Sequence, residues 1–269
     1  MLDRIKYVNS VNEEIDFGTD GIYISSNDFR NYEWSYNSRY SKIIGFQTKI
    51  AKKKLPVTIE GEDANEIANR IFEVIDKDIR NSKPGKVIIN DYEMKGYFFA
   101  SEKKRYLQKG IVKFDLSFVS DNPSWKKESA PYHFNVQETA AKGLDYNHDF
   151  AYDFTSTLYT AQLANPNYTG TDFKLFICGP TVNPIVQIGE NTYSVAVNIE
   201  VNEYLVIDSV EKTVKVVKAD GSTSNAFGSR DKDYNIFAPI APGANNVSWG
   251  SDFSFDVVLI EMRSEPRWN

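Results

Sequence analysis

Apolar and polar residues alternate along most of the chain. In residues 111–118, Phe114, Leu116 and Phe118 fall on one side of an extended backbone, and Lys113, Asp115 and Ser117 on the other. This pattern predicts a strand with one buried and one hydrated face. Similar runs occupy 43–50, 55–60, 86–89, 97–100, 173–178, 184–188, 193–201, 204–208, 212–218 and 253–261. Short strands at this spacing predict a mainly β protein built from sandwiches or barrels.

One segment, residues 62–80, has a helical period instead. Ile67, Ile71, Ile75 and Ile79 recur at four-residue steps, which predicts an amphipathic helix. The acidic residues Glu62, Asp63 and Glu66 lie in its first turn and Arg80 near its last, in agreement with the helix dipole. We expect the four isoleucines to be buried against a sheet, because a lone helix of this length is marginal in water. The alternative is a helix that binds a partner.

The alternation is lost over residues 119–129, where Pro, Asn and charged residues accumulate. Such a composition is typical of a connection between domains, so we divide the chain near residue 130, into 1–130 and 131–269. Residues 1–128 hold 22 basic and 20 acidic side chains, whereas residues 129–269 hold 9 and 17. The two halves therefore differ in charge.

The composition restricts the possible chemistry. The chain of 269 residues has a net charge of -6, an aromatic content of 14%, two histidines and one cysteine. The aromatic content favours strands, and so few soft ligands argue against a zinc cluster or a disulfide framework. Charges in the first six residues argue against a secretory signal, and no apolar stretch approaches the ~20 residues of a membrane span. We expect the protein to fold in a reducing cytoplasm.

No sequence motif for a nucleophile, a phosphate loop or a metal site is present. We expect Cys178 to be a buried structural thiol, and His133 and His148 to be loop or surface residues. A pair of carboxylates in a cleft would suit a glycosidase, but sequence spacing selects no pair. A sandwich that stacks Trp249, Tyr168 or Tyr193 on a sugar is another possibility, although an aromatic in a sandwich is usually core. We predict no catalytic residue, no cofactor and no metal.

Two basic runs fall between predicted strands, where we expect exposed loops: Lys52, Lys53 and Lys54, and then Lys103, Lys104 and Arg105. The first domain is barely basic overall, which argues against a dedicated DNA-binding module. If the protein self-associates, these six residues are candidates for the oligomer interface.

Ordered segments along the whole chain resemble the distal tail protein of siphophages and related prophages of Gram-positive hosts. The segments are residues 14–18, 27–34, 183–185, 203–209, 212–214, 220–221, 225–227, 236–245 and 263–268. They include Asn27-Asp28-Phe29 at one end and Glu265-Pro266-Arg267-Trp268 at the other. Their order along the chain, more than any one of them, carries the resemblance.

The resemblance implies a structural, non-enzymatic protein of the virion tail tip, assembled in the cytoplasm of the bacterial host. Its amino-terminal domain would be a tail-tube-like β-sandwich or split barrel with one helix, and would form a hexameric ring around a channel for DNA in transit. Its carboxyl-terminal domain would be a galectin-like β-sandwich. Implied partners are the protein itself, in one or two stacked rings, the tail-tube protein, and tail-fibre, tail-associated and receptor-binding proteins. No membrane is implied.

Two other functions remain open. A carbohydrate-binding module for host cell-wall polysaccharide would show an exposed aromatic platform in the second domain. A tail-associated hydrolase would show paired carboxylates in a cleft.

Overall fold

The computed structural model describes residues 4–104, 110–136, 159–250 and 252–268. The chain forms two compact units. The amino-terminal unit comprises Met1–Lys127 and Met262–Asn269, and the carboxyl-terminal unit comprises Glu128–Glu261. The final segment of the chain, which the sequence-based division placed in the second domain, thus belongs to the first unit.

The amino-terminal unit is built around an antiparallel sheet of order β2-β1-β7-β8-β9-β6-β3. The long strand β8 pairs with β7 through its first half and with β9 through its second half. The core between the strands and the helix is rich in aromatic rings, among them Tyr7, Phe29, Phe98 and Phe118. The strands are β1 (Ile5–Val8), β2 (Glu14–Asp16), β3 (Ile22–Ile24), β6 (Ala51–Glu60), β7 (Gly85–Ile89), β8 (Tyr92–Lys103) and β9 (Ile111–Ser120).

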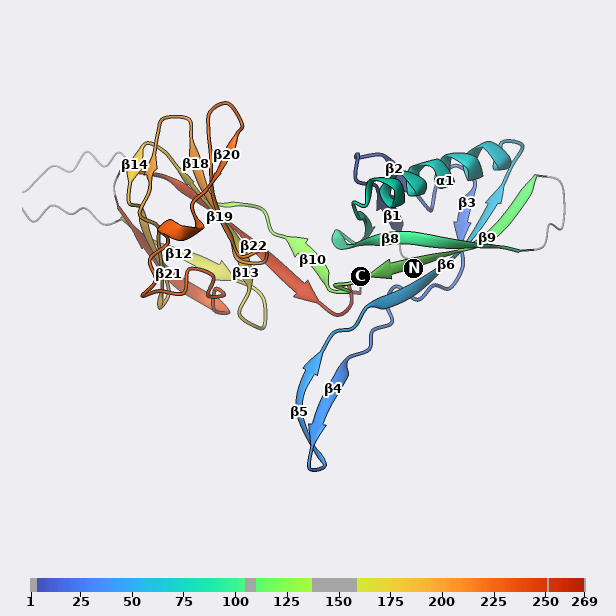
Figure 1. Ribbon diagram of the computed structural model, residues 1–269, viewed down its shortest axis with the longest axis horizontal. Coiled ribbons are helices and arrows are strands. Elements are labelled where there is room, and N and C mark those ends of the chain that lie inside the picture. Colours follow the sequence, from blue (N-terminus) through green and yellow to red (C-terminus); the bar gives the residue numbers. More distant parts are fainter. Residues whose placement is uncertain (1–3, 105–109, 137–158, 251, 269) are drawn as a thin grey trace, which may run out of the picture. The chain divides into compact units, whose positions relative to one another are not determined.

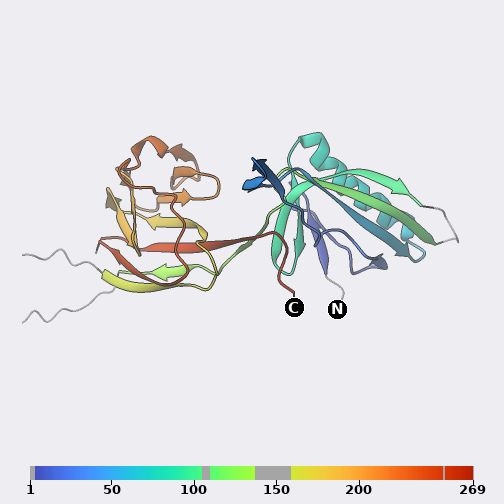
Figure 2. The same ribbon diagram turned by 90° about the horizontal axis from the view of Figure 1, so that it is seen from below.

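Helix α1 (Ala64–Asn81) packs on β6, β8 and β9 (Figures 1 and 2). Ile71 and Ile75 are buried and Ile67 is partly buried, as expected, but Ile79 is 43% exposed. The expectation that all four isoleucines are buried is therefore wrong. A helix turns about 100° per residue, so a four-residue repeat drifts about 40° at each step. By the fourth isoleucine the drift has moved the side chain out of the core, and Asp78 is buried at the end of the helix instead.

A separate two-stranded sheet, β4 (Ser35–Arg39) and β5 (Lys42–Gln47), precedes β6 (Figure 1). The two strands pair only with each other among the described residues. The predicted strand at 43–50 is therefore half of an isolated hairpin, and not part of the main sheet.

The carboxyl-terminal unit is a β-sandwich. One sheet has the order β11-β22-β13-β18-β19-β20 and the other β12-β21-β15-β16. Their strands are β11 (Tyr132–Phe134), β12 (Tyr159–Asn165), β13 (Asp172–Cys178), β15 (Ile185–Ile188), β16 (Asn191–Ser194), β18 (Tyr204–Asp208), β19 (Thr213–Val217), β20 (Thr223–Asn225), β21 (Gly243–Trp249) and β22 (Phe255–Arg263). A single core joins the sheets, with Leu175 and Val257 from the first and Val186 and Val247 from the second.

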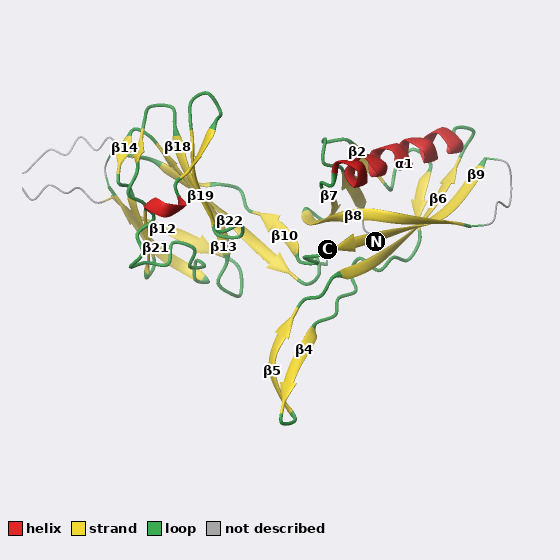
Figure 3. Ribbon diagram, in the orientation of Figure 1, coloured by secondary structure: helices red, strands yellow, loops and turns green. Residues whose placement is uncertain are grey.

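Three short elements complete the description: β10 (Trp125–Glu128) at the junction of the units, and the pair β14 (Thr181–Val182) and β17 (Asn198–Ile199). Strands dominate the described residues, with α1 as their one α-helix and η1 (Phe227–Ser229) a single 3₁₀ turn (Figure 3). The predicted mainly β class is confirmed.

Candidate self-association surface

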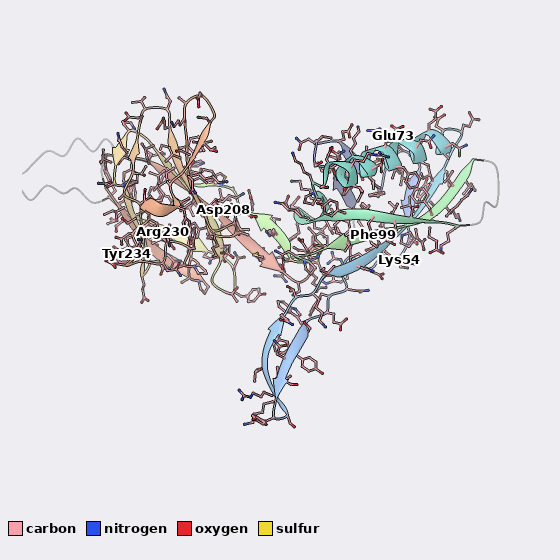
Figure 4. The ribbon with its side chains drawn as sticks, in the orientation of Figure 1. Lys54, Glu73, Phe99, Asp208, Arg230 and Tyr234 are labelled. Atoms are coloured by element: carbon pink, nitrogen blue, oxygen red, sulfur yellow. The ribbon has the colours of Figure 1, made fainter. Side chains whose placement is uncertain are left out.

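The β4–β5 hairpin carries a concentration of exposed apolar side chains. Its turn is the two-residue Tyr40-Ser41 pair, and both residues have positive φ, the geometry that hairpin turns favour. Tyr36, Tyr40, Ile43, Ile44 and Phe46 are each more than half exposed, and the hairpin side chains project into open space (Figure 4). A patch of this kind marks an interaction surface.

The hairpin also has few contacts that would stabilise it in the isolated chain. Among the described residues, no third strand pairs with its two strands, and none of its side chains belongs to the buried core of the unit. An isolated two-stranded hairpin is at best marginally stable in water, and its open edges can accept another strand. A second chain packed on the hairpin would supply apolar contacts for the exposed side chains and hydrogen-bond partners for the open strand edges.

A groove of about 550 Å³ lies where the hairpin joins the amino-terminal unit. Tyr32, Trp34, Lys49 and Lys53 line it, and Ser264 closes one side by accepting a hydrogen bond of 3.1 Å from the Trp34 indole nitrogen. The carboxyl-terminal segment is thereby fastened at the base of the hairpin.

The first basic run does not form a loop. Lys52, Lys53 and Lys54 lie in β6, which pairs with β9 along its length. Lys53 is buried and its ammonium donates to the carbonyl oxygen of Asn31. Burial lowers the pKa of the Lys53 ammonium, and the Asp28 carboxylate partly offsets that shift. The expectation of three exposed loop lysines is wrong, because Lys53 continues the core-facing alternation of β6.

The structure brings the two basic runs together on the hydrated face of the sheet. The Lys54 ammonium lies 3.6 Å from the Asp115 carboxylate and 3.7 Å from that of Glu102, and the Lys104 ammonium lies 3.2 Å and 3.0 Å from the same two groups. These lysines, Lys104 first, lower the pKa of Glu102. Two carboxylates lie between two ammonium groups in this cluster, so the cluster itself is not a concentrated positive patch for a phosphate backbone.

The other residues of the two basic runs are Lys52, Lys103 and Arg105. The Lys52 ammonium lies 5.7 Å from the ring centre of Phe99, and Figure 4 marks Phe99 and Lys54 on this sheet. Lys103 ends β8. Arg105 lies outside the described residues.

The sequence-predicted candidates of the carboxyl-terminal unit are scattered. Trp249 and Tyr193 are buried in the sandwich core, so neither can stack on a sugar, whereas Tyr168 is 73% exposed. His133 is on β11 with its side chain exposed, 2.7 Å from Asp256, in agreement with a surface position. His148 lies outside the described residues.

Cys178 is exposed, so the prediction of a buried thiol is wrong. The alternation of β13 buries Phe173, Leu175 and Ile177 and turns Cys178 outward at its end. Partial desolvation, followed by the Asp256 carboxylate, raises the pKa of the thiol, which disfavours the nucleophilic thiolate.

Among the described residues no group of three or more histidine, cysteine or acidic side chains is placed to hold a metal ion. No helix in the same ranges is long and apolar enough to cross a membrane.

The whole chain has the fold of phage tail hub and baseplate proteins. The crystal structure of the SPP1 Dit protein (gp 19.1), described as a paradigm of the hub adsorption apparatus in phages that infect Gram-positive bacteria, aligns with a TM-score of 0.63 over 98% of this chain and 100% of its own, at 10% identity. A chain of the phage P2 baseplate in its activated conformation with Ca aligns at 0.65 over 99% and 100%, at 11% identity. The same baseplate with Sr gives 0.64 over 99% and 100%, at 10% identity.

No family model matches the sequence. No curated protein matches it either. At about a tenth identity, the likeness to these phage proteins establishes the fold.

Proposed function

We propose that this protein is a distal tail protein, the structural hub of a siphophage or prophage tail tip. The observation that carries the proposal is the alignment of the entire chain, both units included, with the SPP1 Dit protein and with a phage P2 baseplate chain. Because these alignments span nearly all of both chains, they support a role for the whole protein rather than for one shared domain. The ordered segments that resemble distal tail proteins give independent support.

In this role the amino-terminal unit forms a hexameric ring of roughly 180 kDa, six copies of the 30.6 kDa chain. The exposed apolar hairpin supports self-association, because in a closed ring a neighbouring copy can cover the hairpin side chains that are exposed in the isolated chain. The ring joins the tail tube to the receptor-binding apparatus and leaves a central channel for DNA. The balanced charges of Lys54, Lys104, Glu102 and Asp115 would suit a surface that DNA passes without being held.

The proposed partners are the tail-tube protein, tail-associated and tail-fibre proteins, and receptor-binding proteins, the last docking on the outward carboxyl-terminal sandwich. The role is non-enzymatic, and its location is the virion tail tip after assembly in the host cytoplasm. One ring or two stacked rings both agree with this arrangement.

Light scattering coupled to gel filtration tests the ring, and negative-stain microscopy tests its shape. We expect a species near the hexamer mass, or twice that mass for stacked rings, with a central hole. A protein that stays monomeric at every concentration would contradict the proposal.

One observation favours carbohydrate binding as a second candidate. A shallow hollow on the four-stranded sheet of the carboxyl-terminal unit is lined by uncharged hydrogen-bonding side chains: Thr160, Gln162, Gln187, Asn246 and Ser248. Such groups can pair with sugar hydroxyls, although no aromatic ring lines this hollow to stack on a sugar. Binding of host wall polysaccharide to the purified protein, lost in Gln187→Ala, would support this candidate, and silence on a glycan array would remove it.

A further inference from the structure

The hairpin and the segments that flank it are strongly basic. Residues 34–54 hold six basic side chains and no acidic one. Arg39 and Lys42 form the pair that closes the hairpin turn, and both are exposed. The Arg39 guanidinium lies 5.2 Å from the ring centre of Tyr40. A surface that fits this hairpin must therefore offer both apolar contact and negative charge.

The same unit has a surface of that description at the start of α1. A hollow of about 580 Å³ is lined by five acidic side chains, Asp20, Glu60, Glu62, Asp63 and Glu66. Its other lining includes the partly buried Ile67 and a single basic residue, Arg70. All five acids are exposed, and within the described parts of the chain none of them forms an ion pair. Three other acidic residues of the unit differ, since Glu13, Glu14 and Asp16 are paired with Lys77, Lys6 and Arg4.

Strand β6 separates the two surfaces. The hairpin precedes its first residue, Ala51 (Figure 1). The lining of the acidic hollow includes its last residue, Glu60. The strand pairs with β9 without interruption from end to end, so its ten residues hold the two surfaces about 30 Å apart. The hairpin extends away from β6, and so a chain cannot satisfy its own acidic hollow.

We propose that the hairpin of one copy docks in the acidic hollow of the next copy. Arg39 and Lys42 face the acidic side chains, and the apolar hairpin residues cover Ile67 and its surroundings. The occupant is a second copy of this chain because the basic hairpin tip and the acidic hollow are complementary in charge and every copy carries both. The contact joins two different surfaces, and a contact of that type generates rings when the rotation closes. The inference rests on the proposed ring and names the contact that builds it.

Two charge-reversed proteins test the contact. Arg39→Glu with Lys42→Glu reverses the hairpin, and Glu60→Lys, Glu62→Lys and Glu66→Lys together change the net charge of the hollow lining from -4 to +2. Each protein alone places like charges in every contact, so we expect the concentration for half-assembly, measured by light scattering, to rise by tenfold or more. Lys215→Glu with Lys232→Glu, both exposed in the carboxyl-terminal unit, makes the same change in net charge as the hairpin reversal and should leave assembly unchanged.

Mixing the two reversed proteins provides the decisive measurement. The acidic hairpin of one fits the basic hollow of the other, and the unchanged hairpin of the second fits the unchanged hollow of the first. Alternating rings should therefore form in the equimolar mixture at a concentration close to that of the wild type. Alternation closes only for an even number of subunits, as in a hexamer.

The possible results separate the inference from the proposed function. A wild-type protein that never assembles overturns the ring and with it the contact. A wild-type ring that survives both reversals, or reversed proteins that dissociate and do not recover on mixing, overturns this contact and leaves the ring standing.

A crosslink gives a second measurement that does not depend on whether the subunit tolerates the charge reversals. In a Cys178→Ser background, Lys42→Cys and Glu66→Cys place one thiol on each surface. Oxidation should give a ladder of covalent oligomers up to the ring. The same protein without Glu66→Cys should stop at dimers, and a ladder absent from the doubly substituted protein would contradict the contact.

Discussion

The side chain of Ile44 offers a quantitative test of the hairpin as an interface. In the isolated chain Ile44 is 65% exposed, so most of the free energy of burying it remains available to association. Ile44→Ala removes three carbons, each contributing about 0.8 kcal/mol when fully buried. Scaled by the exposed fraction, the loss is about 1.5 kcal/mol for each contact, or about tenfold in its association constant. Gel filtration with light scattering over a dilution series should show half-assembly shifted upward by about that factor.

The folded subunit should be nearly unaffected by the same change, because Ile44 is mostly exposed and is not one of the buried core residues. The matched control is Ile185→Ala, which alters an isoleucine 53% exposed on β15 of the carboxyl-terminal unit. It should leave both assembly and thermal unfolding close to the wild type. If Ile44→Ala assembles at the wild-type concentration, or if Ile185→Ala weakens assembly equally, the hairpin is not the surface that joins the copies.

Three further predictions concern the stability of the subunit. Tyr7→Phe leaves the buried Asp78 carboxylate with the 2.7 Å bond from the Ser10 amide but without the bond from the Tyr7 hydroxyl, and should cost about 2–3 kcal/mol in urea unfolding. Tyr193→Phe, which removes a hydrogen bond to the neutral Ala238 carbonyl, should cost about 1 kcal/mol. Burial, then the Asp78 contact, raises the pKa of Tyr7 in the folded protein. The free energy of unfolding should therefore fall as the pH rises above about 10, the ordinary pKa of tyrosine, and it should fall less steeply in Tyr7→Phe. Equal pH profiles of the two proteins would contradict this. Gly96→Ala would set a methyl group 2.3 Å from the Val119 carbonyl oxygen and should cost about 1–3 kcal/mol, while Gly228→Ala, with open space around it, should cost little by thermal melting.

The sequence predicts elements well where one face of an element is buried. The period of two in β9 and the helical period of α1 follow directly from burial against a core. The same alternation, followed backward from Ile59 through Val57 and Leu55, places Lys53 on the core side of β6. That signal was present in the sequence, but three consecutive lysines suggested a loop because lysine is so rarely buried.

The hairpin shows where the sequence is not sufficient. Ile43, Ile44 and Phe46 have the composition of a core strand, and an interface selects the same residues as a core. In the part of the chain that the structure describes, these side chains are exposed and no third strand pairs with their hairpin, which the sequence pattern does not show. Trp249 and Tyr193 present the reverse case, since their types suit a sugar platform while their positions in the sandwich bury them.

The net charge of the first domain does not reveal the acidic hollow, because it averages over all of its residues. Residues 1–128 are almost balanced in charge, yet the six basic side chains of residues 34–54 and the acids of the hollow lie at opposite ends of β6. The separation has a consequence for the kind of assembly. A two-fold dimer formed through either surface would bring like charges together, basic against basic or acidic against acidic, and that repulsion disfavours it. Contact between unlike surfaces pairs the charges, either reciprocally between two copies or head to tail around a closed ring, and the mass from light scattering distinguishes the two: two copies in the first case and six in the second.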